Sequence, residues 1–138
     1  MKVTYGFIFV FLVLFIGISL ASDEEVSEPQ LLGNWSGTSV GHYANLGYID
    51  EGTFTYTLAI LEQNGRVLNG TLYEEGIRGN KEYPFSGIIG QDLKTLFFAD
   101  YIKGYNTGFI VDDKLIELIL LVDGNEGLSE VCTLTKVE

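Results

Sequence analysis

The sequence has one cysteine, one histidine and one tryptophan among its 138 residues. A single cysteine, Cys132, excludes an intramolecular disulfide and a zinc site built from cysteines. No phosphate-binding loop, dinucleotide fingerprint or metal-ligand spacing is found in the sequence. We therefore expect no metal site and no cofactor. We also expect Cys132, which lies in an apolar run, to be a small buried side chain.

Basic residues are also scarce. Eight Lys and Arg oppose 19 Asp and Glu, and the formal net charge is −11. So acidic a chain is repelled by nucleic acid and by anionic lipid, so we expect no nucleic-acid partner. Long helices are not expected either, because no window shows a 3.6-residue apolar period and glycine occurs 17 times.

The first residues have the pattern of a targeting segment. Lys2 precedes an apolar run over Phe7–Leu20, and Ser19–Ala21 offers small residues for cleavage. The sequence therefore predicts a signal peptide over residues 1–21 and a secreted or cell-surface location. The alternative is an uncleaved N-terminal anchor, which would be the only membrane contact. Residues 22–31 are acidic and predict a solvated linker before one domain over residues 32–138.

The domain divides into runs rich in Val, Ile, Thr, Phe and Tyr, which favour β-strands. Within one run, Phe54, Tyr56, Leu58 and Ile60 alternate with smaller or polar residues and share one face. The expected strands are Leu32–Gly41, Thr53–Gln63, Arg66–Glu74, Pro84–Gly90, Lys94–Ala99, Tyr105–Val111, Lys114–Val122 and Glu130–Val137.

The connections between these runs fall into two classes of length. Three are tight: Asn64–Gly65, Gln91–Leu93 and Asp112–Asp113. Four are longer, over residues 42–52, 75–83, 100–104 and 123–129. Alternate connections of an up-and-down meander lie at the same end, so all the longer loops fall together. The pattern predicts an all-β fold, an eight-stranded antiparallel up-and-down barrel with a tight base and an open mouth.

Three short motifs carry a family resemblance. Gly33-Asn34-Trp35 opens the first run, Leu68–Leu72 reads Leu-Asn-Gly-Thr-Leu, and Thr135-Lys136 lies near the C-terminus. Together they resemble the calycin-type barrels, which include avidins and lipocalins. The resemblance implies that Trp35 plugs the base of the barrel with Lys136 lying across its ring in a cation–π contact.

The ligand chemistry of avidins is not implied by this resemblance. Gly37 and Gly41 stand where avidins have Asn and Ser, and Leu72 stands at their strand-three tyrosine. Biotin is therefore not the expected ligand. A lipocalin C-terminal helix is not recognisable in the sequence.

The mouth is the expected site, because tyrosines and acids gather in and beside the longer loops. Tyrosine offers rigid, amphipathic contact area, although it also suits a barrel end where an apolar ring meets water. Glu117 has two interpretations: a lumenal carboxylate that meets a ligand, or a solvated residue of the outer wall. The candidate ligand-binding residues are Ser39, His42, Tyr43, Tyr48, Asp100, Tyr101 and Glu117.

Three functions are compatible with these features. The first is a secreted binding barrel that takes a small apolar or cationic ligand, or a protein surface, at its acidic mouth. The second is a structural or inhibitory cell-surface domain with a filled barrel. The third is an enzyme that uses His42, which we do not expect because no nucleophile motif accompanies it. Asn34 and Asn69 match the glycosylation acceptor pattern but lie within expected strands.

Overall fold

The computed structural model describes residues 27–102 and 104–138, with residue 126 described by its backbone alone. The expected signal peptide and the first part of the expected linker lie outside the described residues. The strands are β1 (Gly33–Tyr43), β2 (Gly47–Ile49), β3 (Phe54–Asn64), β4 (Val67–Gly76), β5 (Lys81–Ile89), β6 (Thr95–Asp100), β7 (Gly104–Ile110), β8 (Leu115–Val122) and β9 (Leu128–Lys136), with one 3-10 turn, η1 (Gly124–Glu126).

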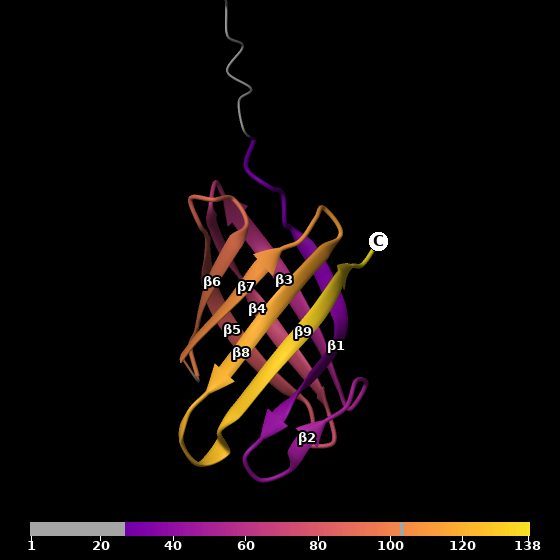
Figure 1. The fold of residues 1–138 in the computed structure, drawn as a ribbon. Helices are drawn as coiled ribbons and strands as arrows, with labels where there is room; N and C mark the ends of the chain where they lie inside the picture. Colours follow the sequence, from indigo (N-terminus) through magenta and orange to yellow (C-terminus); the bar gives the residue numbers. More distant parts are fainter. Residues whose placement is uncertain (1–26, 103) are drawn as a thin grey trace, which may run out of the picture.

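The strands form one closed antiparallel barrel, as the sequence predicts (Figure 1). Each strand from β3 to β9 pairs with its neighbour in sequence, and β1 closes the sheet by pairing with both β3 and β9. The register of the closing pair extends from Trp35 opposite Lys136 to Tyr43 opposite Leu128. Closure removes the edge strands that an open sheet would expose.

The short strand β2 is a feature that the sequence did not predict. Residues 42–52 were expected as a loop, but β1 continues to Tyr43 and pairs with Gly47–Ile49 through three residues. Gly47 has a φ of +78°, which makes the tight return after β1 possible without strain. The tight β3–β4 hairpin also differs in detail, because Asn64 pairs with Val67 and the loop is Gly65–Arg66.

The two ends of the barrel differ as expected. The β3–β4, β5–β6 and β7–β8 turns lie at the end where the chain enters, and the longer connections lie at the opposite end (Figure 1). We call the first end the floor and the second the mouth.

The floor is filled by Trp35, which is fully buried. Its Nε1 donates to the carbonyl oxygen of Leu31 at 2.8 Å, and Lys136 Nζ lies 5.1 Å from its ring centroid. Leu31 is itself buried, and its backbone N–H donates to Gln63 Oε1. The end of the expected solvated linker therefore belongs to the core, because the apolar side chain of Leu31 covers the open bottom of the sheet.

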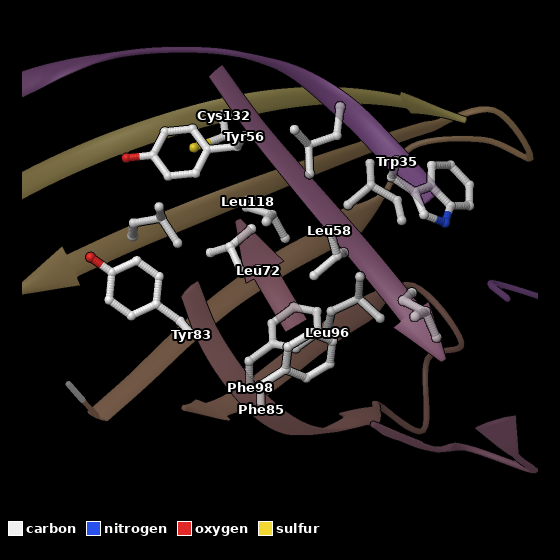
Figure 2. Close-up of a cluster of buried hydrophobic side chains, with 14 of the residues drawn as sticks. Trp35, Tyr56, Leu58, Leu72, Tyr83, Phe85, Leu96, Phe98, Leu118 and Cys132 are labelled. Atoms are coloured by element: carbon white, nitrogen blue, oxygen red, sulfur yellow. The ribbon is translucent and has the colours of Figure 1, made fainter. Parts of the chain in front are cut away.

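Above the floor, the interior is apolar and closely packed. Phe54, Tyr56, Leu58 and Ile60 all face inward, as their alternation predicts. Cys132 is fully buried among them as a free thiol, and burial raises its pKa. Figure 2 shows Trp35 at one end of this core and Tyr56 and Tyr83 at the other, with both hydroxyl groups pointing away from Trp35.

Candidate functional site: a polar cavity in the mouth half of the barrel

The interior changes from apolar to polar towards the mouth. Glu130 of β9 is only 2% exposed, and both of its carboxylate oxygens accept hydrogen bonds. Ser39 Oγ of β1 donates to Oε1 at 3.1 Å, and Tyr56 OH of β3 donates to Oε2 at 2.6 Å. Hydrogen bonds to a charged acceptor are the stronger kind, so these two donors offset part of the cost of burying Glu130.

A second buried carboxylate, Glu74 of β4, is less well satisfied. It is 5% exposed, and Tyr83 OH of β5 donates to its Oε2 at 3.1 Å. Among the described residues, its other oxygen, Oε1, has no hydrogen-bond partner. Lys81 Nζ lies 4.0 Å from Oε1, which gives an electrostatic contact but is too long for a hydrogen bond. Glu74 therefore has one buried carboxylate oxygen without a hydrogen bond among the described residues.

A cavity of about 30 Å³ lies between these groups. A water molecule needs roughly 10–15 Å³ of such space, so the cavity has room for about two water-sized groups. A smaller void of about 10 Å³ continues beneath it towards Phe85 and Phe98. The residues that line the larger cavity are Tyr56, Leu72, Glu74, Tyr83, Asp100, Asn106, Leu120, Val122, Leu128 and Glu130.

The raised pKa values of the tyrosines indicate a negative electrostatic environment. Burial raises the pKa of Tyr56 and Tyr83; the charges of Glu130 and Glu74 raise that of Tyr56 further, and the charge of Glu74 raises that of Tyr83. Tyr43 has a raised pKa for the same reasons, with burial the largest cause. All three therefore remain protonated at neutral pH, and the two that bond the carboxylates act there as hydrogen-bond donors.

Tyr43 and Asp100 lie near the mouth end of this region and make several contacts there. The Tyr43 ring stacks on Phe54 with centroids 5.3 Å apart, and the Arg78 guanidinium lies 5.2 Å from its centroid. The Tyr43 hydroxyl is buried without a hydrogen-bond partner among the described residues. Asp100 accepts hydrogen bonds from the Ile102 and Gly104 N–H groups and from Asn106 Nδ2, which shapes the β6–β7 connection.

Three of the sequence-predicted site residues lie in the mouth half of the barrel interior. Ser39 and Tyr43 point inward from β1, and Asp100 lines the cavity from β6. Ser39 does not line the cavity itself; its Oγ donates a hydrogen bond to Glu130, which does.

The other four candidates lie outside the barrel. His42 is exposed on the outer face, where its ring meets the edge of Tyr48 at 5.0 Å. Tyr101 is exposed and hydrogen bonds with Ser86 Oγ at 2.6 Å. Glu117 lies on the outward face of β8, since Ile116 and Leu118 face inward. The lumenal role considered for Glu117 is therefore wrong.

The outer position of His42 also bears on the enzyme hypothesis. Asp50 and Ser129 line the same outer groove as His42, so the three residue types of a hydrolase triad lie near one another. Within the described part of the chain, however, no hydrogen bond joins His42 to either residue. The described residues therefore do not show the nucleophile–base hydrogen bond that would support this hypothesis.

The central groups of the cavity were not among the predicted site residues. Glu74 and Glu130 were grouped with the loop acids, and Tyr56 and Tyr83 were not singled out. The signal was present in strand parity: Glu74 alternates in phase with Leu72, and Glu130 with Cys132. Two carboxylates in phase with buried side chains point into the barrel.

Comparisons with known proteins add little information about the function of this protein. The chain matches no family model, no curated protein and no solved structure. In the described part of the chain, no group of three or more His, Cys, Asp or Glu side chains is arranged to hold a metal ion. The described residues also contain no helix that is long and apolar enough to cross a membrane.

The Tyr56–Glu130 hydrogen bond gives a testable prediction. Tyr56→Phe keeps the ring but removes the donor to a buried carboxylate, so we expect the free energy of unfolding to fall by about 1.5–3 kcal/mol. Urea unfolding followed by Trp35 fluorescence measures the change. Tyr105→Phe, at an exposed position, is the matched control and should change stability by less than about 0.5 kcal/mol. Equal stability of the two variants would contradict the prediction.

Proposed function

We propose that this protein is a secreted or cell-surface binding barrel that takes a small ligand through its mouth into the cavity beside Glu74 and Glu130. The observation that carries the proposal is Glu74, which lines this cavity and whose buried Oε1 has no hydrogen-bond partner among the described residues. A protein selected only for stability has no use for such a group, because an unsatisfied buried polar atom costs about 1–3 kcal/mol or more.

The same reasoning applies to the cluster as a whole. Replacing buried ionic groups by apolar side chains of similar volume is often neutral or stabilising. The floor half of this barrel shows that the fold can be filled with Leu, Ile and Phe. Two buried carboxylates and three tyrosines in the mouth half are therefore better explained by binding than by folding.

The size of the cavity restricts how a ligand binds. Only a small group fits into about 30 Å³, so the rest of the ligand lies at the mouth. Large apolar side chains are exposed on the strand ends and loops of the mouth and offer contact area there. They are Leu46, Tyr48, Ile77, Tyr101, Ile102 and Tyr105. This rim also suits a protein partner whose side chain enters the cavity. The arrangement extends the resemblance to calycin-type barrels, which bind ligands at the open end.

A pair of adjacent leucines in β8 allows a direct test. Leu120 lines the cavity, whereas Leu121 is exposed on the outer wall. Leu120→Phe should fill the cavity, and Leu121→Phe makes the same chemical change outside it. Each variant and the natural protein are dialysed against a small-molecule extract of the source organism, and the retained compounds are identified by mass spectrometry.

We expect at least one compound to be retained by the natural protein and by Leu121→Phe but lost from Leu120→Phe. Trp35 fluorescence and thermal melting establish that Leu120→Phe is folded. Retention of the same compounds by all three proteins, or of none by any, would contradict the proposal.

A structural domain is the second candidate. It is favoured by the close packing below the cavity, where the remaining void is only about 10 Å³. A filled domain predicts that Leu120→Phe leaves every interaction of the protein unchanged, so the same experiment distinguishes the two functions.

A further inference from the structure

The cavity has the features of a site for one positively charged group. Three carboxyl side chains line it: Glu74 from β4, Asp100 from β6 and Glu130 from β9. Glu130 is held by Ser39 and Tyr56, and Asp100 is held by the β6–β7 backbone and Asn106. Oε1 of Glu74 is the remaining acceptor: it has no hydrogen-bond partner among the described residues, and Glu74 is only 5% exposed.

Among the described residues, no Lys or Arg side chain lines the cavity. Lys81 Nζ approaches Glu74 only to 4.0 Å, and its side chain is 29% exposed. Arg78 lies against the Tyr43 ring at the rim. The tyrosines that line the cavity are neutral donors, because burial and the nearby carboxylates raise their pKa. The cavity therefore combines negative charge with space for a cationic group.

The size of the cavity and the arrangement of its ligands restrict which cation can bind there. A metal ion is disfavoured, because the described His, Cys, Asp and Glu side chains form no cluster able to hold one. A quaternary ammonium is too wide for a cavity of about 30 Å³ and has no N–H to donate. A primary ammonium is close to water in size and carries three N–H donors, as a lysine head group does.

We infer that the ligand carries a primary ammonium group, which enters the cavity and donates to Glu74 Oε1. This inference rests on the proposed function and specifies the chemistry of the ligand. The chain that carries this group packs on the apolar part of the lining, which is formed by Leu72, Leu120, Val122 and Leu128. A narrow methylene chain beside the nitrogen suits these side chains, so the ligand is an unbranched alkylamine or a larger molecule that ends in one. A lysine side chain of a partner protein presents the same chemistry.

The direct probe is n-butylammonium chloride, titrated into the natural protein by isothermal calorimetry at constant ionic strength. Tetramethylammonium chloride carries the same charge without N–H donors, and n-butanol carries the same chain without charge. We expect saturable binding of n-butylammonium, at least about tenfold tighter than either control. Equal affinity for the two cations would overturn the inference, because it would show charge attraction without a shaped site.

Two neighbouring glutamates provide the matched variants. Glu74→Gln removes the inward charge, whereas Glu75→Gln removes the same charge from an exposed side chain. We expect Glu74→Gln to weaken n-butylammonium binding about tenfold or more, and Glu75→Gln to change it less than twofold. Equal weakening in both variants would overturn the inference.

The inference also remains testable if Glu74→Gln fails to fold. Leu120→Phe should then abolish n-butylammonium binding and Leu121→Phe should retain it; retention in both overturns the assignment. The proposed binding function and the amine inference can be contradicted independently. If the compound retained from the extract depends on the cavity but has no primary amine, the binding function stands and the amine inference falls.

Discussion

Replacing Trp35 with alanine is expected to lower the free energy of unfolding by about 3–5 kcal/mol, the range for truncating a buried large aromatic side chain. Trp35 is fully buried at the floor, and its Nε1 holds the carbonyl oxygen of Leu31. The substitution removes the side chain that fills the end of the barrel and the hydrogen bond that fixes Leu31 beneath it. Urea unfolding followed by far-ultraviolet circular dichroism measures the loss, because the variant has no tryptophan fluorescence.

Lys136→Met is the control for the same contact. Lys136 is exposed, and its ammonium lies 5.1 Å from the Trp35 ring centroid. Methionine keeps an apolar stem of similar length over the ring and removes the charge and the exposed hydrogen bond to the Gln30 carbonyl oxygen, so we expect a loss of only about 0.5–1 kcal/mol. If Trp35→Ala is no more destabilising than Lys136→Met, Trp35 does not hold the floor together.

Replacing Gly70 with alanine is expected to cost at least about 3 kcal/mol, at or beyond the usual upper end for overpacking a core. Gly70 lies on the inward face of β4, and a Cβ placed there would lie 1.9 Å from the Ala59 carbonyl oxygen and 3.0 Å from Phe85 Cζ. Backbone cannot move aside as a flexible side chain can, so β3 and β4 must separate locally. Urea unfolding followed by Trp35 fluorescence measures the effect.

Gly127→Ala is the matched control, because the nearest atom to its added Cβ is the Gly124 oxygen at 3.3 Å. We expect its effect to stay below about 1 kcal/mol. A second interior glycine, Gly37, would place a Cβ 1.9 Å from the Thr133 oxygen, and Gly37→Ala should resemble Gly70→Ala. A Gly70→Ala variant as stable as Gly127→Ala would contradict the close approach of β3 and β4.

Strand alternation and loop length determined most of what the sequence could predict about the fold. The alternation over Phe54–Ile60 assigned the inward face of β3 correctly, and the sorting of loop lengths separated mouth from floor. The short strand β2 was missed because its three residues pair only once β1 has extended to Tyr43. Leu31 was missed because its acidic neighbours suggest a solvated segment, whereas its burial depends on the shape of the floor.

The candidate site was less predictable, for a physical reason. Acids near loops are usually solvated, so Glu74 and Glu130 did not stand out from their exposed neighbours. Their inward direction follows from parity, but the cavity between them depends on how Leu120, Tyr56 and Tyr83 pack across the barrel. That packing is a property of three-dimensional distances, and no spacing in the sequence specifies a void of about 30 Å³.

The two ends of the described chain lie together beneath the floor, on the side opposite the mouth (Figure 1). Lys136 Nζ contacts the Gln30 carbonyl oxygen at 3.4 Å, so the start and the finish of the barrel are held within one hydrogen bond of each other. A tether, an affinity tag or a sensor surface attached at the C-terminus consequently leaves the opening turned to bulk solution. Immobilised protein should therefore remain as accessible to a dissolved ligand as protein free in solution.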